Sequence, residues 1–154
     1  MHIAVVNGPN LNLLGVREPG RYGTASLGDI EAAVRARASG LGVDISWLQS
    51  NHEGELIEAI QALRGNADGA LINAAAFTHT SLAIRDAALA AEVPFVELHL
   101  TNIWAREEER GRSLLADLAV GVVAGFGAQS YILALEGLVG WLRRSAGAAK
   151  SVEV

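Results

Sequence analysis

Short, continuously apolar runs alternate with longer segments of helical periodicity along this 154-residue chain. A strand with one face in water alternates polar and apolar residues, whereas Ile3 to Val6 is apolar at every position. Such a run suits a strand buried on both faces, as in a parallel sheet covered by helices. The predicted strands are His2 to Val6, Val43 to Leu48, Ala70 to Asn73, Phe95 to Leu100 and Val120 to Ala124.

Helical patterns fill the intervals between these strands. Ser26 and Asp29 have the spacing of a capping box at the start of the first predicted helix, which Gly40 and Gly42 end. The four predicted helices cover about residues 26–41, 52–63, 81–91 and 127–144. We therefore predict one α/β domain over residues 1–144, with a doubly wound, five-stranded parallel sheet in three layers, and a flexible tail over residues 145–154.

Composition narrows the possible functions. The chain is 51% hydrophobic and 19% charged, which is typical of a soluble globular protein, and we expect it to be cytoplasmic and to bind no membrane. Its net charge of −5 argues against nucleic acid as a partner. Because it has no Cys, thiolate nucleophiles and sulfur-ligated metals are excluded. The only Lys, Lys150, lies in the tail and is a poor candidate for imine chemistry.

A connection of close to twenty residues follows the first predicted strand, where two to six are usual. It runs from Asn7 to Gly23 and combines Asn, Arg and Tyr side chains with Leu residues that can anchor it to a core. We interpret it as an active-site loop. In a doubly wound sheet, ligands bind beyond the carboxyl ends of the strands, at the point where the strand order reverses. That rule brings together one set of strand-end residues: Asn7, Asn10, Asn73, His99, Thr101 and Asn102.

Tyr22 lies near Arg17 and Arg21 in the loop. A free phenol has a pKa near 10, so its use as a base at pH 7 requires about 4 kcal/mol of stabilisation of the charged form. A guanidinium ~4 Å away supplies an energy of that order at an effective dielectric constant of ~20. The loop can therefore make a tyrosinate, although Tyr22 as a simple packing anchor is the alternative.

Two histidines have possible acidic neighbours. Glu97 and His99 share one face of the fourth strand, so the carboxylate can orient an imidazole that donates a proton, unless His99 is only structural. His79 and Asp86 are seven residues apart, two turns along one face of the third helix and ~10 Å from each other. At this distance His79 and Asp86 cannot pair with each other. Each side chain meets a ligand or a neighbouring subunit separately, or both simply belong to a polar helix face. The four His residues form no metal-binding motif.

The chain resembles the type II 3-dehydroquinate dehydratase family from residue 3 to about residue 138. The matching motifs are residues 7–15 (NGPNLNLLG), 17–19 (REP), 22–23 (YG), 49–54 (QSNHEG), 78–81 (THTS), 97–102 (ELHLTN) and 105–108 (AREE). The resemblance implies a flavodoxin-like fold without flavin, metal or other cofactor. It also implies a homododecamer of four trimers that dehydrates 3-dehydroquinate to 3-dehydroshikimate in the shikimate pathway.

The resemblance also assigns residues. Tyr22 would be the base, with its pKa lowered by Arg17, and Asn10 would hold a water that stabilises an enolate. His99 would protonate the departing hydroxyl. Five further positions would contact the substrate: Asn73, the backbone of Leu100 and Thr101, His79 and Arg110. Asp86 would reach the site of an adjacent subunit.

Several positions depart from the usual family pattern. Ala74 and Ala75 stand where Pro-Gly is common. The other departures surround Arg110 and are Trp104, Glu109, Gly111, Arg112 and Leu114, so we expect altered packing there. Arg21 is not part of the signature. Two alternatives stay open: a non-catalytic flavodoxin-like binding module, and an assembly subunit that has lost activity.

Overall fold

The computed structural model describes residues 1–16 and 24–150, excluding the side chains of residues 149 and 150. It contains a parallel sheet of five strands in the order β2-β1-β3-β4-β5. The strands are β1 (His2–Asn7), β2 (Asp44–Gln49), β3 (Gly69–Asn73), β4 (Phe95–His99) and β5 (Gly121–Ala124). The predicted five-stranded, doubly wound α/β fold is confirmed.

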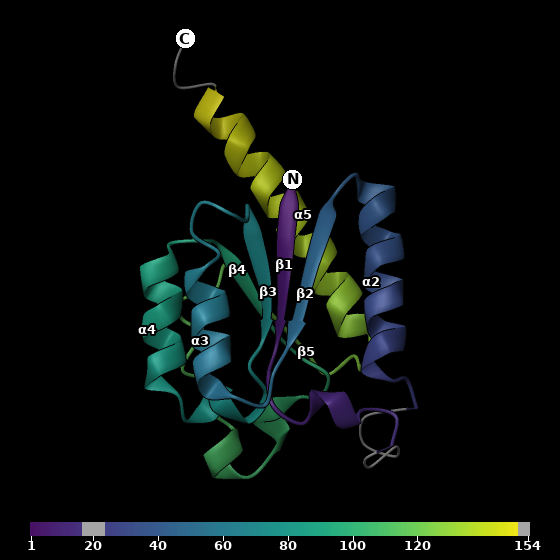
Figure 1. Cartoon of the computed structure of the whole chain (residues 1–154), viewed down its shortest axis with the longest axis vertical. Coiled ribbons are helices and arrows are strands. Elements are labelled where there is room, and N and C mark those ends of the chain that lie inside the picture. Colours follow the sequence, from purple (N-terminus) through teal and green to yellow (C-terminus); the bar gives the residue numbers. More distant parts are fainter. Residues whose placement is uncertain (17–23, 151–154) are drawn as a thin grey trace.

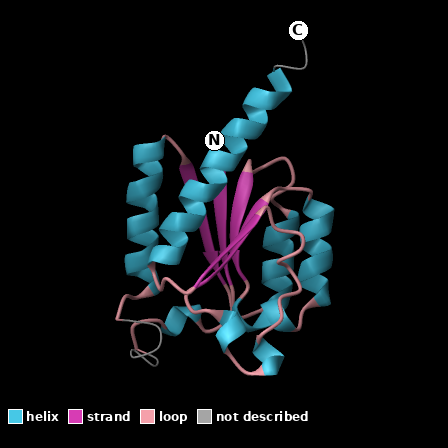
Figure 2. Cartoon of the chain, turned by 180° about the vertical axis from the view of Figure 1, so that it is seen from behind, coloured by secondary structure: helices cyan, strands magenta, loops and turns pink. Residues whose placement is uncertain are grey.

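Helices cover both faces of the sheet, giving three layers (Figures 1 and 2). The helices α2 (Leu27–Leu41) and α5 (Gln129–Lys150) pack together on one face, and α3 (Glu53–Gln61) and α4 (Leu82–Ala91) on the other. Two apolar clusters fill the spaces between the layers, one centred on Ile3, Leu98 and Leu135, the other on Ile60 and Ile84. Five of the six residues of β1 and all five residues of β3 and of β4 are therefore buried, as continuous apolar runs predict.

Local signals placed the first helix correctly. The Ser26 hydroxyl accepts a hydrogen bond from the Asp29 backbone N–H at 3.1 Å, and the Asp29 carboxylate accepts one from the Ser26 N–H at 2.9 Å. This is the predicted capping box. The hydrogen bonds from Ser26 lower the pKa of Asp29.

The predicted end of the last helix and the predicted position of His79 were wrong. The last helix continues to Lys150, six residues beyond the predicted end at Arg144, and projects past the sheet (Figure 2). Helix α4 begins at Leu82, close to its predicted start, because Ser81 caps it by accepting from the Ile84 N–H at 2.9 Å. His79 belongs instead to a separate 3-10 turn, η2 (Ala75–His79). His79 and Asp86 therefore do not share a helix face.

The strand order reverses between β1 and β3, and the backbones that leave these two strands lie in close contact. The Gly8 N–H donates to the Asn73 carbonyl at 2.7 Å. A Cβ at position 8 would lie 2.5 Å from the Ala74 carbonyl oxygen, so only glycine fits. Ala75, one residue further, has φ +51°, in the left-handed region that glycine adopts more readily. The glycine common in the family at this position has a conformational reason.

We predict that Gly8→Ala destabilises the protein by about 3 kcal/mol, because the new methyl group forces the β1 and β3 loops apart. The matched control is Gly40→Ala in α2, where a Cβ meets no atom within 4 Å. That change should stabilise the helix by about 0.5 kcal/mol. Denaturant unfolding of both variants measures the difference, and equal stabilities would contradict the close approach.

Candidate active site

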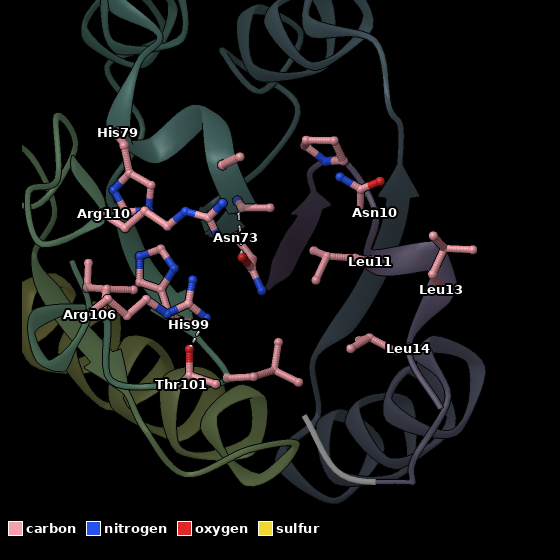
Figure 3. Close-up of a pocket in the computed structure, with 15 residues that line it drawn as sticks. Asn10, Leu11, Leu13, Leu14, Asn73, His79, His99, Thr101, Arg106 and Arg110 are labelled. Atoms are coloured by element: carbon pink, nitrogen blue, oxygen red, sulfur yellow. Dashed lines mark hydrogen bonds between the residues drawn. The ribbon is translucent and has the colours of Figure 1, made fainter. Parts of the chain in front are cut away.

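A cavity of about 150 Å³ opens at the carboxyl ends of β1, β3 and β4, at the lower edge of the sheet in Figure 1. Its lining residues come from three connections: Pro9, Asn10, Leu11, Leu13 and Leu14 after β1; Asn73, Ala75, Ala76 and His79 after β3; and His99, Leu100, Thr101, Ile103, Arg106 and Arg110 after β4. Figure 3 shows His79, His99 and the two arginines on one side of this pocket and the leucines across it. Basic side chains therefore line one wall of the pocket, and apolar side chains line the opposite wall.

The rim predicted from the strand ends is largely observed. Asn10, Asn73, His99 and Thr101 all line the pocket. Asn7 lies beneath it, fully buried, and Asn102 caps the 3-10 turn η3 (Ile103–Ala105) by accepting from the Trp104 N–H at 3.1 Å.

His99 has the carboxylate partner that strand alternation predicted. Its Nε2 donates to Glu97 Oε1 at 2.7 Å, and both side chains are buried. The Ser113 hydroxyl donates to the same carboxylate, 2.7 and 2.9 Å from its two oxygens. Ser113 is itself held by the N–H groups of Leu115 and Ala116. With Nε2 occupied, the Nδ1 atom of His99 is the nitrogen left to meet a ligand.

His79 reaches the pocket from η2, and its orientation depends on the segment that follows β4. Its Nδ1 donates to the Arg112 carbonyl at 2.6 Å, which leaves Nε2 for a ligand. The neighbouring Thr78 carbonyl accepts from the Leu114 N–H at 2.9 Å, and Arg85 donates to the Leu114 carbonyl at 2.6 Å. We call residues 101–115 the lid segment. Its last residues contact His79 directly, through the Arg112 carbonyl, and His99 indirectly, through Ser113 and Glu97.

Two arginines of the lid segment line the pocket. Arg106 donates to the Thr101 hydroxyl at 2.5 Å, which fixes its guanidinium against the end of β4. Arg110, in the 3-10 turn η4 (Glu108–Arg110), is exposed and pairs with Glu107 at 3.2 Å. An anionic or polyhydroxylated ligand in the pocket would therefore meet one fixed guanidinium, that of Arg106, and one more exposed guanidinium, that of Arg110.

Asn10 lies opposite, in the loop after β1. Its φ is +66°, and its N–H donates to Asn51 Oδ1 at 2.9 Å. Asn51 is in turn bonded by Gln49 at the end of β2, so the start of the loop is held from the neighbouring strand. The 3-10 turn η1 (Leu11–Leu13) follows and buries Leu11 against the core.

Asn73 ends β3 and takes part in a buried polar cluster. Its Nδ2 donates to the Tyr131 hydroxyl at 3.0 Å, and that hydroxyl donates to Asn7 Oδ1 at 2.6 Å. Tyr131 is fully buried, which raises the pKa of its phenol far above the ordinary value. Tyr131 therefore stays protonated at neutral pH, and of the two tyrosines in the chain only Tyr22 is a candidate base.

Not every predicted site residue is placed in the pocket. Arg17, Arg21 and Tyr22 lie outside the described residues, so their predicted roles stay predictions. Asp86 is exposed on α4 and is not among the residues that line the pocket. Leu100 and Thr101 do line it.

Sequence reasoning missed three residues that shape the site: Arg106, Ser113 and Tyr131. Arg106 belonged to a matched motif but had no assigned role. Ser113 is sixteen positions from Glu97 and Tyr131 is fifty-eight from Asn73, so no local spacing signals either contact.

No cluster of three or more potential metal-ligating side chains occurs in residues 1–16 and 24–148. None of the helices in the described part of the chain has both the length and the apolar character needed to cross a bilayer.

Known proteins share this sequence and architecture. The family model for class II dehydroquinases matches residues 1–139. A relative from Parasynechococcus marenigrum (strain WH8102), named 3-dehydroquinate dehydratase, is 57% identical over 145 residues, covering 94% of this chain and 99% of the relative. One from Jannaschia sp. (strain CCS1) with the same name is 55% identical over 144 residues, covering 94% and 97%.

A solved type II dehydroquinase from Propionibacterium acnes has a TM-score of 0.86 and 37% identity, covering 90% of this chain and 96% of that one. The corresponding enzyme from Butyrivibrio crossotus also has a TM-score of 0.86, with 38% identity over 90% and 97%. Sequence, fold and pocket therefore agree, and the chain belongs to the class II dehydroquinase family.

Proposed function

We propose that this protein dehydrates 3-dehydroquinate to 3-dehydroshikimate through an enolate, with a tyrosinate base and a histidine acid. The observation that carries the proposal is the position of His99 in the pocket, held through Nε2 by Glu97, beside the side chains of Asn73, His79 and Arg106. The names of the relatives, at 51–57% identity, point to the same substrate.

The reaction needs one proton removed beside the ketone and one hydroxide lost from the neighbouring ring carbon. Tyr22, as a phenolate stabilised by Arg17, takes the proton, and the electron pair moves onto the ketone oxygen. A water bound by Asn10 donates to that oxygen. As the enolate collapses, the carbon–oxygen bond breaks and protonated His99 gives its Nδ1 proton to the departing hydroxyl, which leaves as water. No electrons leave the substrate, so no redox cofactor is needed.

Substrate orientation would come from the rest of the pocket. The substrate carboxylate accepts from the free Nδ2–H of Asn73 and from the backbone N–H groups of Leu100 and Thr101. His79 Nε2 and Arg110 bind ring hydroxyls. Asn73 and Leu100 are buried, which strengthens the attraction of their N–H groups for an anion relative to water.

The chemistry places the enzyme in the shikimate pathway, which makes aromatic compounds, and the protein would work in the cytoplasm. Quinate breakdown uses the same step and would require no change of site.

We predict that Tyr22→Phe lowers kcat at least about 100-fold with little change in KM, because the base is lost while the binding groups stay. The assay follows formation of the conjugated enone by ultraviolet absorbance. Borohydride should leave the wild type active, since no imine forms. Lys150→Ala is the control and should keep full activity. Borohydride inactivation in the presence of substrate would refute the enolate route, and an inactive wild type would favour an assembly subunit.

We predict that Glu97→Gln lowers kcat roughly 10- to 100-fold, because a neutral amide no longer stabilises the His99 imidazolium through a charged hydrogen bond. KM should change little, since Glu97 does not line the pocket. The matched control is Glu92→Gln, which neutralises an exposed carboxylate that pairs with Arg64. Equal kcat values in both variants would count against His99 as the acid.

We further propose a homododecamer of four trimers in which Asp86 contributes to a neighbouring site. Asp86 is exposed on α4 and does not line the pocket of its own chain, which supports a role across an interface. Sedimentation equilibrium measures the mass of the assembly, which should be twelve times that of the 16.1 kDa chain.

Subunit mixing tests the shared site. Tyr22→Phe and Asp86→Ala should each be nearly inactive alone. After dissociation and reassembly together, about a quarter of the sites regain both native residues if Asp86 comes from a neighbouring subunit. Activity should recover accordingly. Absence of recovery, with mixed assemblies demonstrated by mass spectrometry, would place Asp86 in the site of its own chain or outside any site.

A further inference from the structure

We propose that Tyr131 is a positioning residue that sets the direction in which the Asn73 side-chain amide faces the pocket, through a hydrogen-bond chain that begins at the Leu48 carbonyl. The inference rests on the proposed function only for the ligand, because that proposal assigns Asn73 to the substrate carboxylate. The positioning itself follows from four hydrogen bonds among described residues.

The first end of the chain is a backbone acceptor. The Leu48 carbonyl can only accept, so the Asn7 side chain turns its Nδ2 toward it, at 3.1 Å. Asn7 Oδ1 then faces the Tyr131 hydroxyl at 2.6 Å. The single phenolic hydrogen goes to Asn7, and toward its other neighbour Tyr131 can only accept.

The second end is a backbone donor. The Ala75 N–H can only donate, and it lies 3.3 Å from Asn73 Oδ1. Asn73 Nδ2 is therefore the atom that donates to Tyr131, at 3.0 Å. A flipped Asn73 amide would set its oxygen against a phenol with no hydrogen left and its NH₂ group against an N–H. Both backbone ends thus require the same orientation.

Burial makes the orientation costly to change. Asn7 and Tyr131 are 0% exposed and Asn73 is 2% exposed, so water cannot replace a lost partner. The Tyr131 ring stacks on Trp47 of strand β2, with ring centroids 5.8 Å apart, which adds packing to α5 but no hydrogen bond to the chain. Neither Asn7 nor Tyr131 lines the pocket, while Asn73 does. This hydrogen-bond chain therefore leaves the second N–H of the Asn73 amide to face a ligand oxygen.

A double-mutant cycle tests this role. Tyr131→Phe should raise KM for 3-dehydroquinate roughly tenfold and leave kcat within about threefold, because the amide loses its fixed direction. In an Asn73→Ala background the same change should alter KM less than about twofold, since no amide is left to orient. Asn7→Leu provides a second route: it removes the acceptor that uses the phenolic hydrogen, and it should repeat the KM effect.

The matched control is Trp47→Phe, which loosens the packing of the Tyr131 ring without removing a member of the chain. It should lower the melting temperature and leave KM unchanged. Additive effects of Tyr131→Phe and Asn73→Ala in an active wild type would overturn the inference while the proposed function stands.

A second measurement needs no activity. In ¹H–¹⁵N spectra the Asn73 Nδ2 proton bonded to Tyr131 should be protected from exchange, and Tyr131→Phe should remove that protection. Unchanged protection would overturn the inference. Lost protection in a protein that forms no enone would support it and reject the proposed function alone.

Discussion

The close contact between the ends of β1 and β3 is the constraint on which the site depends. The Gly8 N–H reaches the Asn73 carbonyl at 2.7 Å, so the two connections diverge from almost a single point. One leads to Asn10 and the other to His79, and the space that opens between them is bounded on its far side by the end of β4. A side chain at position 8 would keep the strands apart and remove the common origin of these walls.

Several polar side chains beneath the pocket are fully buried, and the free-energy cost of burying an unpaired polar group explains why they form hydrogen-bonded chains. An unpaired polar group in such surroundings costs more than a typical hydrogen bond returns. Glu97 is fully buried, yet its carboxylate accepts from both His99 and Ser113. Asn7 and Tyr131 are similarly paired. The same pairing that makes these groups tolerable in the core also fixes the direction in which His99 and Asn73 face the pocket.

The lid segment is bonded to the site at its far end. Arg112 accepts from His79, Ser113 donates to Glu97, and Leu114 is held by Thr78 and Arg85. Arg85 also forms a bidentate pair with Asp117, which raises the pKa of Arg85 and lowers that of Asp117. Movement of residues 112–114 would therefore reorient the pocket histidines, and two of these residues, Arg112 and Leu114, are among the departures from the family pattern.

The sequence by itself determined the layered α/β fold, because apolar runs and helical stripes are local patterns that report which faces are buried. It also determined the pairing of Glu97 with His99, since residues two apart on a strand share a face. Only the tertiary structure decided that Ser113, Arg106 and Tyr131 shape the site, because their partners lie on other elements. It likewise decided that His79 lies outside α4, because the helix begins only after its Ser81 cap.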